Sequence, residues 1–145
     1  MNASFNYRLP GVFAILLLTL IAYYPALNNE LTNWDDDFYV TNNPLIRVAS
    51  FQDVVSMFSQ FQNANYHPLT TLSLAVDYHF AGLDPRLYHL VNVSVHTLNT
   101  GLVFWLIYLL LNSYETAVIA SALFGIHTLH VESVAWVSCG ITIAH

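Results

Sequence analysis

The sequence predicts an all-α membrane protein with about three transmembrane helices and interfacial helices in the first outer loop. Hydrophobic residues make up 56% of the 145 residues and charged residues only 8%, whereas about a quarter of the residues in a soluble domain are charged. The apolar residues also form runs long enough to cross a hydrocarbon layer of about 30 Å. Both observations indicate that much of the chain lies in lipid.

The first predicted span covers about residues 10–27. Its run VFAILLLTLIAYYPAL has about the length that a bilayer requires. A cleaved signal peptide is the alternative, but Tyr23, Tyr24 and Pro25 stand where a cleavage site needs small residues. We therefore expect an uncleaved anchor. Arg8, just before it, favours an N-terminus on the inner side of the membrane.

The second and third spans are predicted at about residues 87–111 and 116–137. The second ends in LVFWLIYLLL, and Asn112 and Ser113 offer a turn before the third. The far half of the third span carries ionisable side chains, which in membranes usually face a bundle interior or a wet cavity. We therefore expect a functional site at that end. Three spans would place it on the same side as the outer loop, residues 28–86.

The outer loop is predicted to hold two amphipathic helices. Ser50 with Asp53 resembles a capping box, and apolar residues follow at helical spacing. These residues are Phe51, Val54, Val55, Phe58 and Phe61. Pro68 suits the first position of the other helix, which Gly82 would end. Because the first helix has no cations on its polar face, we expect apolar burial to hold it along the membrane surface.

A polar stripe runs along the second span. His89, Asn92, His96 and Asn99 recur at steps of three and four residues, which places them on one face of a helix. Hydrogen bonding between helices is one explanation, and a hydrophilic cavity open toward the outer loop is the other. Three helices are too few to bury such a stripe, so we expect further helices or a partner.

The charged residues point away from nucleic acid and toward an acidic site. The net charge is −6, with no lysine and three arginines, and phosphate binding needs clustered cations. Three successive carboxylates, Asp35, Asp36 and Asp37, stand just after the first span. Since adjacent carboxylates repel one another, the cluster is a solvated acidic turn, a metal site or a proton-transfer site.

The histidines of the third span invite a metal interpretation that its geometry opposes. His127 and His130 would share one helical face, and imidazole is a common metal ligand. On a straight helix Glu132 points roughly 140° away from His127. We therefore predict no three-ligand metal site, and a substrate contact and plain bundle packing both remain open for this segment.

Four segments in order, NWDDDFYVTNNPLI, YHPLTTLSLAVDY, GLDPRLYHLVNVSVHTLN and ALFGIHTLHVESVAWVS, resemble the N-terminal region of a known enzyme family. This family comprises the transmembrane and tetratricopeptide-repeat-containing O-mannosyltransferases and their bacterial relatives, which are GT-C glycosyltransferases. The resemblance extends from about Tyr24 to Ser138. It implies that residues 1–145 form a partial GT-C transmembrane domain, without the tetratricopeptide-repeat domain.

The resemblance implies transfer of a sugar, mannose-like, from a polyprenyl or dolichyl phosphate to Ser or Thr hydroxyls of an acceptor protein. Asp35 would be the catalytic base and Asp36 its neighbour. His67 would border the substrate cavity. His130, Glu132 and Ser133, in the motif of the third helix, would contact substrate. The lipid-phosphate sugar would be a substrate, and the resemblance does not imply a definite cofactor. The membrane would be that of the endoplasmic reticulum in a eukaryote, or the inner membrane in a bacterium.

The chain also departs from the family. After ESVAWVS the family continues with a charged segment, whereas this chain reads CGITIAH, so we expect a fragment that is inactive alone. A non-catalytic membrane scaffold or accessory subunit is the alternative. A metal- or proton-translocating protein would need a continuous polar path, which LVFWLIYLLL does not offer. The glycosyltransferase interpretation predicts that the WDDD segment and the outer end of the third span approach one another around a cavity.

Overall fold

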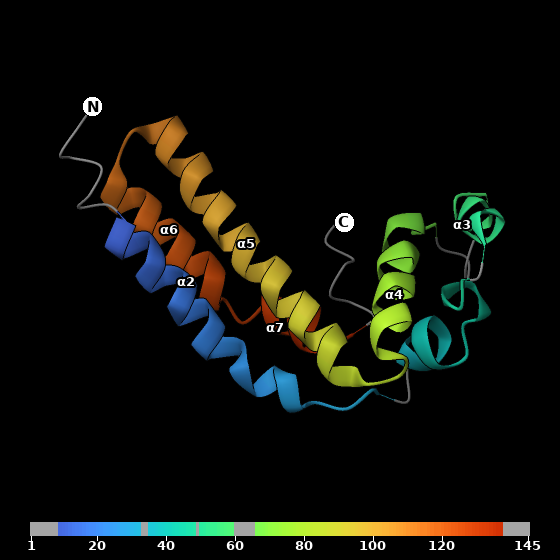
Figure 1. The fold of residues 1–145 in the computed structure, drawn as a ribbon. Coiled ribbons are helices and arrows are strands. Elements are labelled where there is room, and N and C mark those ends of the chain that lie inside the picture. Colours follow the sequence, from blue (N-terminus) through green and yellow to red (C-terminus); the bar gives the residue numbers. More distant parts are fainter. Residues whose placement is uncertain (1–8, 33–34, 49, 60–65, 138–145) are drawn as a thin grey trace.

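The computed structural model describes residues 9–32, 35–48, 50–59 and 66–137, and within these ranges every regular element is helical. In chain order they are α2 (Leu9–Tyr23), η1 (Tyr24–Asn28), η2 (Asp37–Thr41), η3 (Pro44–Ile46), α3 (Phe51–Met57), α4 (Pro68–Ala81), α5 (Pro85–Leu111), α6 (Tyr114–Ile126) and α7 (His130–Ala135). Figure 1 shows α2, α5 and α6 packed side by side, with α3 and α4 beyond the start of α5. The predictions that rest on Arg8, Phe61 and CGITIAH lie outside the described residues.

Two helical segments have the length and composition of membrane spans. They are Pro10–Asn28, which joins α2 to η1, and Pro85–Leu111, which is α5. Only 22% and 17% of their most apolar stretches are buried, and side chains such as Leu98 and Leu110 are more than two-thirds exposed. A continuous apolar surface of this kind needs an apolar neighbour. The length, composition and exposure of these two segments indicate a membrane protein.

The segment predicted as a continuous third span is not one helix. α6 has 13 residues, about 20 Å, and the chain is extended at His127 (φ −67°, ψ 133°) before α7 begins. The His127 ring accepts a hydrogen bond from the Leu129 N–H at its Nδ1 atom (3.2 Å), so a side chain competes with the helical backbone pattern. That α6 and α7 together cross a membrane remains a prediction.

The break leaves helix-end carbonyls that side chains of other helices satisfy. The Tyr23 hydroxyl donates to the His127 carbonyl (3.3 Å), and His96 Nε2 contacts the Gly125 carbonyl (3.1 Å). Because a carbonyl only accepts, this His96 nitrogen carries the hydrogen. The His127 carbonyl also accepts from the His130 N–H (3.0 Å), and the two side-chain bonds tie the break to α2 and α5.

Small residues allow the three long helices to approach closely. Gly125 of α6 faces Thr19 of α2 and Thr100 of α5, and a Cβ added at Gly125 would overlap with both threonines. Both threonine hydroxyls donate back to carbonyls of their own helices, at 3.0 Å each. Close backbone approach at small residues is a common way for membrane helices to pack.

The outer loop folds around a small core that also includes a residue after α7. Its buried members come from η2, η3, α3, α4 and α5, with Val137 from the segment after α7, and they are Val40, Ile46, Met57, Leu74, Ala75, Tyr88 and Val137. The loop therefore packs as a folded unit against the start of α5.

Helices lie at both predicted places in the outer loop, but the first, α3, ends at Met57, before the predicted Phe58. α3 begins with a capping box in which the Ser50 N–H donates to the Asp53 carboxylate at 2.8 Å, and α4 runs from Pro68 to a Gly82 cap with φ +60°. Several of their apolar side chains stay exposed, Phe51 at 82% and Phe80 at 76%. Their position on a membrane surface remains a prediction.

Candidate active site

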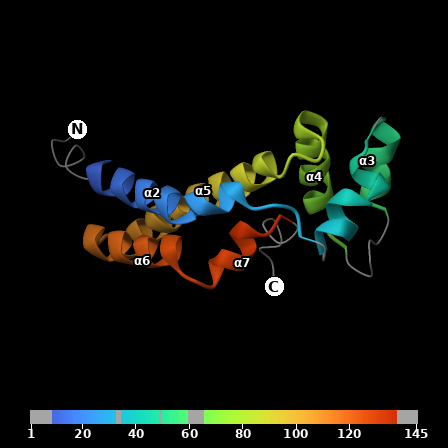
Figure 2. The same cartoon turned by 90° about the horizontal axis from the view of Figure 1, so that it is seen from below.

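The segment after α2 and the end of α7 are joined by hydrogen bonds. The Asn29 side-chain amide donates to the Ala135 carbonyl (3.3 Å), and the Trp136 indole N–H donates to the Thr32 hydroxyl. From α5, the Asn92 side chain donates to the Trp136 carbonyl (3.1 Å). In Figures 1 and 2, α7 lies next to the first part of α5. These contacts are made by Asn29 and Thr32, which precede the WDDD segment, and Asp36 of that segment is hydrogen-bonded to Thr32. The approach of the two motifs around a cavity remains a prediction.

Asp36 is fully buried where these segments meet. Its Oδ2 atom accepts from the Thr32 N–H (2.9 Å) and from the Thr32 hydroxyl (3.1 Å). A hydroxyl donates one hydrogen and has two lone pairs, so Thr32 can donate to Asp36 while it accepts from Trp136. The Trp136–Thr32–Asp36 chain therefore links the acidic turn to α7. Asp35 is half-buried beside it.

Most of the polar stripe of α5 is buried by the described helices themselves. His89, Asn92 and His96 are at most 4% exposed, and Asn99 is half-buried. The expectation that three helices are too few to bury the stripe is wrong for His89, Asn92 and His96. The rings of Tyr23, Phe124 and His130 pack against His96, and Trp136 contacts Asn92. Asn92 and His96 are hydrogen-bonded to Trp136 and Gly125, which favours the packing explanation for this pair.

His89 differs from its neighbours in the stripe. It is 1% exposed, and neither ring nitrogen has a hydrogen-bond partner among the described residues. The Asp36 carboxylate lies near enough to act on the ring electrostatically, and the Asn29 backbone also approaches it without a hydrogen bond of good geometry. A buried imidazole in this state costs folding free energy.

His130 takes part in an aromatic cluster at the α6–α7 break. Its ring lies 4.5 Å from the Phe124 ring and 5.3 Å from the His96 ring, between centroids. Glu132 is exposed and Ser133 half-buried on α7. Within the described residues, no group of three His, Cys, Asp or Glu side chains is placed to hold a metal ion.

His67 lies apart from the start of α5. It precedes α4, and its carbonyl accepts from the backbone and the hydroxyl of Thr71, both at 3.1 Å. α4 is 14 residues long, about 20 Å, and its other end leads to α5. The structure therefore places His67 one helix length from the junction with α5, and its role at a substrate cavity remains a prediction.

A cavity of about 290 Å³ adjoins the hydrogen-bonded segments. Its lining residues are Ala22, Tyr23, Pro25, Ala26, Asn29, Ile126, Val131 and Ala135. The wall is mostly apolar, and Asn29 belongs both to this wall and to the contact with Ala135. None of the predicted site residues lines it, so this cavity lies beside the acidic turn and does not contain it.

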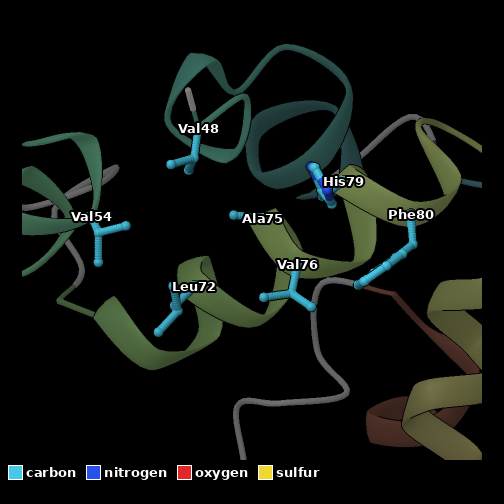
Figure 3. Close-up of a pocket in the computed structure, with 7 residues that line it drawn as sticks. All are labelled: Val48, Val54, Leu72, Ala75, Val76, His79 and Phe80. Atoms are coloured by element: carbon cyan, nitrogen blue, oxygen red, sulfur yellow. The ribbon is translucent and has the colours of Figure 1, made fainter. Parts of the chain in front are cut away.

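A second cavity, of about 240 Å³, lies in the outer loop between α3 and α4. Figure 3 shows its lining residues, Val48, Val54, Leu72, Ala75, Val76, His79 and Phe80. His79 is its only ionisable side chain, so the cavity offers no pair of groups for acid–base chemistry. We assign it no catalytic role.

Sequence reasoning missed several residues of the site. Asn29 and Thr32 were not singled out, and Trp136 appeared only as part of a motif. The available signal was the presence of two hydrogen-bonding residues directly before an acidic run. Their partners lie more than 100 positions away in the chain, so spacing alone could not identify the contacts.

Comparison with known proteins places the chain among named enzymes. It is 41% identical over 143 residues to protein O-mannosyl-transferase Tmtc1 of Drosophila melanogaster, which covers 93% of this chain and 17% of that protein. It is 34% identical over 126 residues to protein O-mannosyl-transferase tmtc2 of Xenopus laevis, covering 81% of this chain and 15% of that protein.

Human TMTC2, also named a protein O-mannosyl-transferase, is 39% identical over 71 residues, which are 49% of this chain and 8% of that protein. No protein-family model matches the chain, and no solved structure matches it significantly. The chain thus spans less than one fifth of the length of these relatives. From the identities over most of its residues, we conclude that the chain is a homologue of the TMTC protein O-mannosyl-transferases.

Proposed function

We propose that the chain forms the acidic part of the active site of a membrane glycosyltransferase of the GT-C type. This enzyme would transfer a sugar, mannose-like, from a polyprenyl or dolichyl phosphate to Ser or Thr hydroxyls of an acceptor protein. One observation carries the proposal beyond the names of the relatives. A fully buried carboxylate, Asp36, is hydrogen-bonded to a segment that itself contacts the end of α7. A solvated acidic turn would have no need of such burial.

In the proposed reaction Asp35 is the base. The Asp35 carboxylate accepts the proton of the acceptor hydroxyl while its oxygen bonds to the anomeric carbon of the sugar. The bond from that carbon to the lipid phosphate breaks, and the phosphate leaves with the bonding electrons. The anomeric carbon is inverted. Asp36, buried and held by Thr32, fixes the backbone that carries Asp35.

The other predicted site residues take roles that fit their exposure. Exposed Glu132 and half-buried Ser133 can reach sugar or acceptor hydroxyls from α7. The His130 ring, packed on Phe124, would shape the wall behind them, and His67 would act at the far end of α4. The membrane would be the endoplasmic reticulum membrane of a eukaryote or the inner membrane of a bacterium, and the chain would cross it several times.

Activity is best tested in a chimera in which this chain replaces the matching segment of the Drosophila melanogaster relative. Asp35→Asn should lower sugar transfer to a Ser/Thr acceptor by about 100-fold or more, because an amide is not a base. Asp37→Asn, next in the same acidic run, is the matched control and should retain transfer. If Asp35→Asn transfers sugar at the unmodified rate, the carboxylates are not catalytic and the scaffold alternative stands.

A further inference from the structure

His89 sits on the face of α5 that is turned toward the acidic turn. It precedes Asn92 by three residues, so the two side chains share one helical face. The Asn92 side chain donates a hydrogen bond to the Trp136 carbonyl. The Trp136 indole N–H donates to the Thr32 hydroxyl, and this hydroxyl donates to Asp36. His89 thus lies about one helical turn before Asn92, on the same face of α5, and points toward the same group of hydrogen-bonded residues.

A buried imidazole without partners needs an explanation. Such groups are rare in folded proteins and often mark strain or a catalytic role. An apolar side chain of similar size would avoid the cost of leaving two ring nitrogens unpaired. The structure therefore carries at position 89 a buried residue that is unfavourable for stability and interacts electrostatically with the Asp36 carboxylate.

We propose that His89 is a positioning residue for the acid pair, an inference that rests on the proposed function. When substrate occupies the site, a ring N–H of His89 donates to the Asp36 carboxylate and so fixes the direction of Asp35. Catalytic hydrogen bonds are often open in the unliganded enzyme and close only in the complex.

The proposal separates stability from activity. His89→Leu removes the unpaired nitrogens and keeps an apolar volume, so the chain should unfold at the same temperature or higher. The same change in the chimera should lower kcat by about 10- to 100-fold with little change in KM, because a misdirected base affects the chemical step. His89→Gln, whose amide can donate to Asp36, should restore a large part of kcat.

His79→Leu is the matched control, since His79 is an exposed histidine of α4 that lines only the loop cavity. It should retain transfer. If His89→Leu keeps full kcat, or if it lowers the unfolding temperature and kcat together without rescue by glutamine, His89 is a packing residue and the inference is overturned.

A second measurement does not depend on activity. In the chimera in lipid nanodiscs with ¹⁵N-labelled histidine and a saturating dolichyl phosphate mannose donor, Asp36→Asn should shift the ring nitrogen resonances of His89 and leave those of His79 in place. Unchanged His89 resonances would refute the contact with Asp36 even if Asp35→Asn abolishes transfer. Conversely, a shifted His89 with an active Asp35→Asn chimera would refute the proposed function and keep the contact.

Discussion

Thr32 connects the segment after α2 to the end of α7 by hydrogen bonds. Its hydroxyl accepts from the Trp136 indole and donates to Asp36, and its backbone N–H donates to the same carboxylate oxygen. A hydrogen bond to a charged group contributes about 1.5–3 kcal/mol. The orientation of the acidic turn therefore depends on a side chain outside the acidic run.

Thr32→Val should release this link with little change in side-chain volume. We expect the chain to lose about 1–2 kcal/mol of unfolding free energy, and the chimera to lose activity more than affinity. Thr32→Ser, which keeps the hydroxyl, is the matched control. Thermal unfolding in detergent micelles followed by Trp fluorescence measures the first effect. Equal stability of the Val and Ser variants would contradict a role for the hydroxyl.

Asp77 of α4 makes stability depend on pH. It is 6% exposed, and burial raises its pKa from 3.8 to about 6. The folded chain therefore keeps this proton at pH values where the unfolded chain has lost it. The contribution of Asp77 to the free energy of unfolding is fully present below about pH 4 and is lost as the pH rises through 6. The loss amounts to about 3 kcal/mol.

Asp77→Asn should remove this part of the pH dependence and raise the unfolding temperature at pH 7. Unfolding temperatures measured between pH 4 and pH 7 check the prediction. A slope in the variant as steep as in the parent chain would show that another group is responsible.

At the scale of helices, the packing of α2, α5 and α6 depends on Gly125. Gly125→Ala should separate the helices, because its Cβ would overlap with Thr19 and Thr100, and overpacking costs about 1–3 kcal/mol. Gly101→Ala is the matched control, since its Cβ would meet only Leu16 Cδ2 at 3.6 Å. If the unfolding temperatures of the two variants fall by the same amount, α2, α5 and α6 do not approach one another closely at Gly125.

Some helix ends could be predicted from local sequence, and others could not. Ser50, Pro68 and Gly82 act within one helical turn, so the starts of α3 and α4 and the end of α4 could be predicted from them. The end of α6 could not. AVIASALFGIHTLHVES is apolar enough for one long helix, and the break at His127 is satisfied by Tyr23 and His96, which belong to other helices.

For the whole molecule, the three-span prediction fixes which segments share a side of the membrane. Single cysteines at Asp84, Ser113 and Glu132, in a Cys139→Ser background, test it with a membrane-impermeant thiol reagent on sealed vesicles. Positions 84 and 132 should react from one side and position 113 from the other, because α5 is long enough to cross. Equal reactivity of 113 and 132 would mean that α6 and α7 do not cross.

Composition and apolar periodicity by themselves determined that the chain is helical and lies in a membrane, because both are properties of short, continuous segments. The run of three carboxylates was visible in the sequence, and the family resemblance singled out Asp35 and Asp36 within it. Only the tertiary structure decided that Asp36 is the buried member, that Thr32 and Trp136 hold it, and that His89 is buried without a hydrogen-bond partner among the described residues. These facts arise where α5 and α7 bring distant residues together, and no local pattern in the sequence encodes such contacts.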